Sequence, residues 1–267
     1  MKVLVTGSSG FIGSHVKKRL EKEGHEVVGY DIKEGYDVRD AESLRKAMKG
    51  CRSVVHLAAL CIGQESLDNP EPYFATNSYG TFNALNAARG VGVESFAYAA
   101  SAASVEALTP YGQSKLDGQL WVQLFRKLYG MNTFALRLYN VYGEGDDKGV
   151  IDKWMRKIKS RNPIIIYGDG NQTRDFINVS DVAGAFADFA VNWKSHPVKD
   201  AYEIGTGNVI NVNDLARLMF RVLGKEAEIQ RFPARAGEVR HSKSENPYIT
   251  PKITLEEGIR RLAKFYA

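Results

Sequence analysis

The chain has 267 residues, of which 44% are hydrophobic and 25% are charged, and its formal net charge is +5. These values are typical of a globular protein with a sizeable core, and they exclude a disordered or fibrous chain. The basic and acidic side chains are interleaved, which argues against a nucleic-acid-binding surface.

The chain begins with a short apolar strand at 2–6, followed by a glycine-rich turn and a helix. Gly7 allows a tight turn, Gly10 allows the backbone to approach a pyrophosphate, and Gly13 allows the helix to pack close to the strand. The helix N-terminus adds amide donors and a positive dipole end for the phosphates. This context predicts a dinucleotide-binding turn rather than an ordinary loop.

A second strand is predicted at 25–30, and Asp31 follows it directly. A carboxylate at this point accepts hydrogen bonds from an adenosine ribose and repels a 2′-phosphate. The sequence therefore favours NAD over NADP, the alternative being that Asp31 is a solvated loop carboxylate.

Strands and helices alternate along the rest of the chain, which predicts an α/β fold with a doubly wound parallel sheet. Further strands are expected at 53–57, 94–99, 133–138 and 201–204, and helices at 11–23, 41–49, 71–89, 111–129, 150–160, 180–193, 211–223 and 254–265. Ligands of such sheets bind beyond the carboxyl ends of the strands. The residues at or just after the expected strand ends are Gly7, Asp31, His56, Ser101 and Asn140.

Tyr111 and Lys115 form the most informative pair in the chain. They lie one turn apart at the start of the helix expected at 111–129, so their side chains share one face. An ammonium beside a phenol favours the phenolate, so the pKa of Tyr111 is expected to fall below its usual value of about 10. A tyrosine tuned in this way takes or gives a proton near neutral pH.

These motifs, in this order, resemble the extended branch of the short-chain dehydrogenase/reductase superfamily, the NAD-dependent nucleotide-sugar epimerases and dehydratases. The resemblance runs nearly end to end and includes the runs 136–143, 167–176 and 235–238. It implies a Rossmann-type sheet domain over 1–140, to which part of 175–210 returns, and a smaller nucleotide-sugar-binding region over 141–267. The cofactor-binding residues that it implies are Gly7, Gly10, Phe11, Ile12, Gly13, Asp31, Asp37, Val38, Leu57, Ala58, Ala59, Asn77, Tyr111 and Lys115.

The substrate implied by the resemblance is a nucleotide sugar, with a UDP-sugar favoured. Arg174 and Arg235 match arginines that grip the diphosphate, a task for which the guanidinium fork is suited. Glu238 could accept a hydrogen bond from the nucleoside ribose, and Asn140 could donate one to a phosphate. The alternative for each arginine is a surface salt bridge.

Ser101 is the third expected catalytic residue, beside Tyr111 and Lys115, and it also binds the sugar hydroxyl; Ser104 is the alternative. The implied reaction is epimerisation at C4, interconverting UDP-glucose and UDP-galactose through a transient keto intermediate. Ala102 and Ala103 stand where dehydratases and decarboxylases of this branch carry an acidic residue, which disfavours elimination. Another nucleotide-sugar oxidoreductase, decarboxylase or dehydratase of the family, or a non-catalytic NAD-binding regulatory protein, remain the alternatives.

The chain departs from the family pattern near the expected substrate site. The loop between Ser101 and Tyr111 is shorter than in the family, and Cys61 stands where epimerases often carry a lysine. The two cysteines match no metal-ligand spacing, so no metal is expected.

The partners and location are also expectations. The helices at 71–89 and 111–129 match a pair through which members of the branch dimerise, which implies a homodimer. No apolar run is long enough to span a membrane, and no signal peptide precedes the first strand, so we expect a cytoplasmic protein.

Overall fold

The computed structural model describes residues 1–266 in two compact units. Unit 1 is formed by Met1–Leu138 and Ala183–Tyr202, and unit 2 by Tyr139–Val182 and Glu203–Ala267. The chain therefore leaves unit 1, returns to it and leaves again. Within residues 1–266, no helix is both long and apolar enough to cross a membrane.

Unit 1 is built on a parallel sheet whose strand order is β2-β1-β3-β4-β5-β9. The strands are β1 (Lys2–Thr6), β2 (Glu26–Tyr30), β3 (Ser53–His56), β4 (Ser95–Ser101), β5 (Asn132–Leu138) and β9 (Tyr202–Ile204). Strands β1 to β5 pair in parallel, with Val3 opposite both Val27 and Ser53. The order reverses at β1, and in open α/β sheets a crevice for ligands lies beyond the carboxyl ends at such a point. The expected α/β fold is confirmed.

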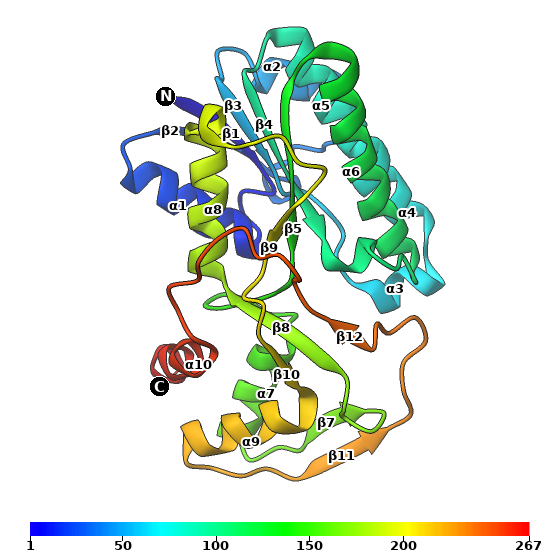
Figure 1. The fold of residues 1–267 in the computed structure, drawn as a ribbon, viewed down its shortest axis with the longest axis vertical. Helices are drawn as coiled ribbons and strands as arrows, with labels where there is room; N and C mark the ends of the chain where they lie inside the picture. Colours follow the sequence, from blue (N-terminus) through cyan, green and yellow to red (C-terminus); the bar gives the residue numbers. More distant parts are fainter. Residues whose placement is uncertain (267) are drawn as a thin grey trace. The chain divides into compact units, whose positions relative to one another are not determined.

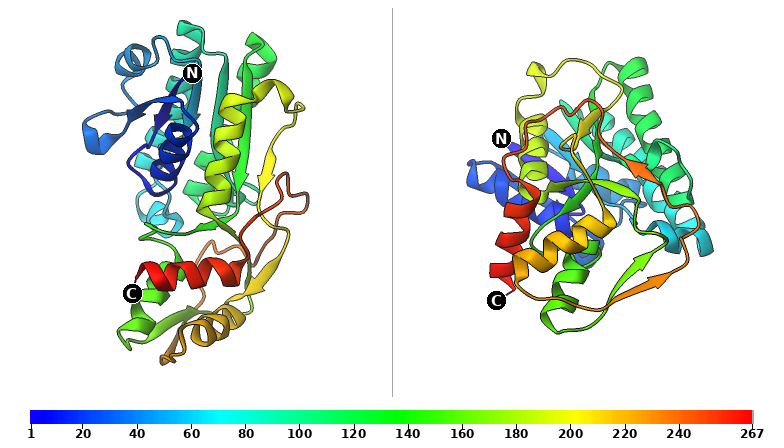
Figure 2. Two further views of the ribbon diagram at one scale, coloured as in Figure 1. Left: turned by 90° about the vertical axis from the view of Figure 1, so that its left-hand side faces the viewer. Right: turned by 60° about the horizontal axis from the view of Figure 1, so that its bottom comes forward.

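Helices cover both faces of this sheet (Figure 1). On one face lie α1 (Phe11–Lys22) and residues 183–191 of α8 (Val179–Val191). The other face carries α2 (Ala41–Ala47), α5 (Gly80–Val91) and α6 (Pro110–Tyr129), as the turned view in Figure 2 also shows. Buried apolar side chains between the layers, such as Leu4, Phe96 and Val122, form the core of unit 1.

The helix α6 begins and ends at residues suited to those positions. The Thr109 hydroxyl accepts a hydrogen bond from the Gly112 N–H at 3.1 Å, and Pro110 occupies the first helical position. Gly130 ends the helix with a φ of 65°, which a residue without a Cβ adopts readily. These caps fix where the helix that carries Tyr111 starts relative to β4.

The helix expected over 71–89 differs from the observed structure. It is divided into α4 (Glu71–Tyr73), the π-helical segment η2 (Phe74–Tyr79) and α5. Such π-helical turns are rare and are frequent at functional sites. The short α3 (Gly63–Asp68) and the 3₁₀ turns η1 (Ile32–Glu34), η3 (Ala102–Ser104) and η4 (Trp193–Ser195) were not predicted.

Up to residue 266, unit 2 contains two small sheets, three complete helices and the first turn of α8. One sheet joins β6 (Asn140–Tyr142), β8 (Thr173–Asn178), β10 (Val209–Asn211) and β12 (His241–Ser242), and the other pairs β7 (Ile164–Tyr167) with β11 (Ile229–Phe232). The helices α7 (Val150–Lys159), α9 (Val212–Leu223) and α10 (Leu255–Phe265) contact one another. Trp154, Met219 and Ile259 are buried in the core that these elements form.

Candidate active site

Ser101 and Tyr111 face each other at the carboxyl end of β4. Ser101 is the last residue of β4 and Tyr111 lies in the first turn of α6, with 3.3 Å between their hydroxyl oxygens. The alternative residue, Ser104, is buried and donates its hydroxyl proton to the carbonyl oxygen of Ser101 at 2.6 Å. The geometry therefore places Ser101, and not Ser104, in contact with the Tyr111 hydroxyl.

The pKa of Tyr111 does not fall as expected. Burial raises the pKa of Tyr111 to about 12, and the hydrogen bond with Ser101 only partly opposes this rise. The expectation from the spacing with Lys115 is therefore wrong, because desolvation outweighs the Ser101 hydrogen bond and the neighbouring Cys61 and Tyr73 raise the pKa further. The main chain of Tyr111 is held by the Ser66 hydroxyl, which accepts its N–H at 3.1 Å.

Lys115 lies one helical turn beyond Tyr111 and is only 4% exposed. Burial lowers the pKa of the Lys115 ammonium to about 7. Its Nζ lies 4.4 Å from the centre of the Tyr98 ring, which comes from β4. No sequence motif marks Tyr98. The one sequence signal for it is Gly118, a glycine inside the predicted helix, which faces the Tyr98 hydroxyl.

The glycine-rich turn has the shape that a dinucleotide pyrophosphate needs. Gly7 adopts a φ of 68°, and a Cβ added there would lie 2.8 Å from the backbone nitrogen of Ala58. Gly10 begins α1 without a side-chain cap, so the first amides of the helix are left for a ligand. These amides include the N–H groups of Phe11 and Ile12, the first residues of α1.

Asp31 joins the end of β2 to the glycine-rich turn. This buried carboxylate accepts the Ser9 N–H at Oδ2 and the Lys33 N–H at Oδ1, each at 2.9 Å. Each carboxylate oxygen can accept more than one hydrogen bond, so Asp31 keeps capacity for a ribose hydroxyl. The residues of the turn and Asp31 therefore fit NAD.

Asp37 and Val38 follow a short link after Asp31. The Asp37 carboxylate accepts two hydrogen bonds from the Arg39 Nε, at 3.0 and 2.9 Å, and this pairing holds its pKa below the usual range. Val38 is buried, and its side chain would contact a Cβ placed on Gly80 of α5. Val38 thus belongs to the core of unit 1, while the Asp37 carboxylate is paired with Arg39.

The expected cofactor-binding residues Leu57, Ala58 and Ala59 directly follow the end of β3. The Thr6 hydroxyl accepts the N–H groups of both Leu57 and Ala58 at 3.1 Å. Asn77, in the π-helical segment, accepts the Leu60 N–H at 2.8 Å and donates to the Leu60 carbonyl at 2.9 Å. Its amide also donates to the Ser114 hydroxyl at 2.9 Å. Asn77 therefore connects the end of β3 to α6.

Apart from Ser101, the expected substrate-binding residues lie in unit 2. Arg174 donates to a carboxylate oxygen of Glu238 at 2.8 Å, and the Arg235 guanidinium lies 3.7 Å from the centre of the Tyr167 ring. Burial lowers the pKa of Arg174, the charge of Glu238 opposes this fall, and the charge of Arg235 adds to it. The Arg235 charge is thus close enough to act on Arg174, and Glu238 is paired with Arg174. Asn140 donates to the Asp175 carbonyl at 3.1 Å.

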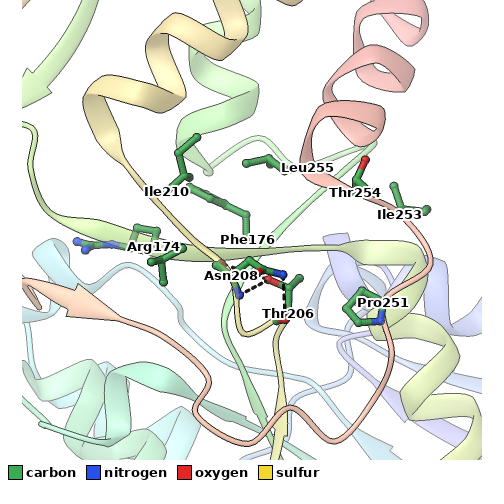
Figure 3. A pocket seen from close by; sticks show the side chains of 10 residues that line it. Arg174, Phe176, Thr206, Asn208, Ile210, Pro251, Ile253, Thr254 and Leu255 are labelled. Atoms are coloured by element: carbon green, nitrogen blue, oxygen red, sulfur yellow. Dashed lines mark hydrogen bonds between the residues drawn. The ribbon is translucent and has the colours of Figure 1, made fainter.

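A groove of about 340 Å³ in unit 2 adjoins Arg174 (Figure 3). Apolar side chains, including Phe176, Ile210 and Leu255, form much of its lining. In Figure 3 the guanidinium of Arg174 points away from Ile210 and Leu255. Arg174 therefore both lines this groove and pairs with Glu238.

Comparison with known proteins identifies the family. Residues 3–205 match the model of the NAD dependent epimerase/dehydratase family. The chain belongs to this family of enzymes, and its cofactor is NAD. The resemblance seen in the sequence, the Rossmann-type fold and the choice of NAD are thereby confirmed.

Similar proteins cover the whole chain. A putative UDP-glucose 4-epimerase of Methanocaldococcus jannaschii is 33% identical over 302 residues, covering 98% of this chain and 97% of the relative. The UDP-glucuronate 4-epimerase of Thermodesulfobacterium geofontis is 29% identical, covering 97% and 94%. The structure of the Thermus thermophilus UDP-glucose 4-epimerase in complex with NAD superimposes with a TM-score of 0.90 at 28% identity, covering 100% and 99%.

Proposed function

We propose that this enzyme epimerises a UDP-sugar at C4 and that its substrate pair is UDP-glucose and UDP-galactose. The observation that carries the proposal is the contact between the Ser101 and Tyr111 hydroxyls at the end of β4, beside the buried ammonium of Lys115. Relatives named as UDP-glucose 4-epimerases support this choice of substrate. We assign NAD binding to unit 1 and binding of the nucleotide sugar to unit 2.

In the proposed mechanism, the Tyr111 phenolate removes the proton of the sugar 4-hydroxyl, which Ser101 orients by a hydrogen bond. NAD⁺, when bound, supplies the hydride acceptor at C4 and afterwards the hydride donor. Tyr111 returns its proton to the oxygen of the keto sugar once the sugar has presented its other face. In the active form, Lys115 is charged beside Tyr111 and favours the phenolate during both transfers.

Residues next to Ser101 support epimerisation over elimination. Ala102 and Ala103 follow Ser101 in the 3₁₀ turn η3, and an alanine side chain has no acid or base to offer. A dehydratase needs a further proton donor and acceptor at the sugar. Ser101, Tyr111 and Lys115 alone suffice for reversible oxidation at C4.

We further propose that Arg174 and Arg235 hold the diphosphate and that Glu238 receives a ribose hydroxyl. Guanidinium groups form paired hydrogen bonds with phosphate oxygens, and the contact between Arg174 and Glu238 orients one of them. Asn140 keeps one amide hydrogen for a phosphate, because its bond to Asp175 uses the other.

The test is to incubate the purified protein and NAD with UDP-glucose or UDP-galactose and to separate the products by anion-exchange chromatography. Either substrate should give the same mixture of both sugars. UDP-glucuronate and UDP-N-acetylglucosamine belong in the same panel, and conversion of one of these alone would assign the enzyme to that sugar. If the protein binds NAD but converts none of them, our proposal is wrong, and another reaction of the family or a regulatory role takes its place.

We also propose a homodimer that forms through α6. Leu120, Leu124 and Leu128 repeat along α6 and are exposed. Exposed apolar stripes of this kind are typical of interaction surfaces. Leu124→Glu should convert the dimer to a monomer in multi-angle light scattering, whereas a wild-type monomer would contradict the assignment.

A further inference from the structure

The Tyr98 ring provides a surface for the Lys115 ammonium inside unit 1. The two side chains are 1% and 4% exposed, so neither interaction partner is free in solvent. The Lys115 Nζ lies 4.4 Å from the centre of the ring. A cation at this distance from an aromatic face is attracted by the negative charge that the ring carries there.

Tyr98 is held in place from several sides. Its hydroxyl donates to the main-chain carbonyl of Lys115 at 3.2 Å, and the His56 ring stacks on it with centres 6.0 Å apart. A Cβ on Gly118 would lie 2.2 Å from the Tyr98 hydroxyl, so only glycine leaves room for this contact. The ring is thus fixed relative to the helix that carries both Tyr111 and Lys115.

The ring is the main interaction partner of the ammonium. Within residues 1–266, no carboxylate forms an ion pair with Lys115, and the one neighbouring group whose charge raises its pKa is Cys61, as its thiolate. A buried ammonium without a counter-ion would ordinarily lose its proton or move toward water.

We propose that Tyr98 is a positioning residue for Lys115, with a ring face that keeps the ammonium charged and in place beside Tyr111. The inference rests on the proposed function only for the use of that charge in catalysis. Tyr98 itself touches neither the sugar nor the phenol of Tyr111 in this assignment.

The test measures the protonation of Lys115 directly, by trace acetylation of the NAD-bound protein across pH and mass spectrometry of the Lys115 peptide. Tyr98→Leu should lower the midpoint of labelling by about one pH unit, the effect of losing one desolvated cation–π contact. Tyr98→Phe keeps the ring and should label like the wild type. Tyr129→Leu removes the ring beneath Arg89, 4.4 Å away in the same unit, and serves as the matched control that leaves Lys115 unchanged.

Because Tyr98 is buried in the core, Tyr98→Leu could fail to fold, and a second set of variants keeps the inference testable. Phenylalanine carrying one or three ring fluorines, placed at position 98, preserves the shape while weakening the charge of the ring face. The labelling midpoint of Lys115 should fall stepwise with fluorine number. An unchanged midpoint throughout this series would overturn the inference.

Activity separates this inference from the proposed function. In the variants with a lowered midpoint, kcat/KM should fall about tenfold when the midpoint moves by one pH unit, and its acidic limb should move by the same amount. If the wild type converts no nucleotide sugar while the labelling midpoints change as expected, the proposed function fails and the role of Tyr98 stands. If the wild type is active but all variants have the same labelling midpoint for Lys115, the proposed function stands and the role of Tyr98 fails.

Discussion

A Cβ on Gly13 would lie 1.9 Å from the carbonyl oxygen of Gly7, closer than any two such atoms approach in proteins. The first turn of α1 therefore packs directly on the glycine-rich turn. Gly13→Ala should separate the two, with a loss of stability of about 1–3 kcal/mol and of most NAD affinity. Isothermal titration with NAD and thermal unfolding measure the two effects.

The control for this change is Gly90→Ala in α5. A Cβ at Gly90 meets only the Arg45 side chain, at 3.9 Å. Alanine favours a helix over glycine by about 0.5–1 kcal/mol, so this variant should be slightly more stable and bind NAD normally. Equal NAD affinity in both variants would contradict the role given to Gly13.

Replacing the two serines at the end of β4 should have different consequences. Ser101→Ala removes the hydroxyl that contacts Tyr111, and kcat should fall about 100-fold, as for loss of one positioned hydrogen bond in a transition state. Ser104→Ala removes a buried bond to the Ser101 carbonyl and should cost about 1 kcal/mol of stability with kcat within a few-fold. Steady-state kinetics and urea unfolding decide, and the reverse pattern would make Ser104 the catalytic residue.

The ionisation of Tyr111 and Lys115 predicts the pH dependence of the reaction. Burial lowers the pKa of Lys115 to about 7 and raises the pKa of Tyr111 to about 12. The active form, phenolate with ammonium, holds one proton fewer than the fully protonated pair, so it forms only when one proton leaves. That first proton leaves near pH 7, and kcat/KM should therefore rise with pH through about 7 and then level off.

Lys115→Met provides the check on this assignment. Without the amine, the proton must come from Tyr111 itself, whose pKa burial raises to about 12, so the rise should move far above pH 7 toward that value and the maximum should fall. A rise that stays near pH 7 in Lys115→Met would show that another group titrates there.

Asp31 should determine the preference for NAD. Asp31→Asn removes the negative charge and replaces one carboxylate oxygen by an NH₂ group. That NH₂ group cannot accept the N–H of Ser9 or Lys33 that the oxygen accepted. NAD affinity should fall about tenfold, and NADP should bind more nearly as well as NAD, because the 2′-phosphate is no longer repelled. Titration with both dinucleotides measures this, with Glu34→Gln as the control that removes the exposed carboxylate bonded to the Ser9 hydroxyl.

The sheet of unit 1 could be predicted from the sequence, because its strands are continuous apolar runs that end in turn residues. No strand of the two small sheets in unit 2 was predicted, and β6, β10 and β12 are too short to show a period. They exist through pairing: β6 and β12 lie parallel to β8, and β10 lies antiparallel to it.

The π-helical segment η2 likewise could not be predicted from the sequence. A helical period over 71–89 predicts one regular helix, and the interruption becomes understandable only from the contacts of Asn77 with Leu60 and Ser114. Those partners are distant from Asn77 in the chain, so no local pattern records them.

The sequence by itself determined the cofactor and the helical turn that carries Tyr111 and Lys115, because both depend on a few consecutive residues. Only the tertiary structure decided how that pair ionises: burial raises one pKa and lowers the other, opposite to what their spacing suggests. A pKa depends on all the groups around an atom, and here these include the Tyr98 ring from a separate strand. The same tertiary contacts chose Ser101 over Ser104 as the partner of Tyr111.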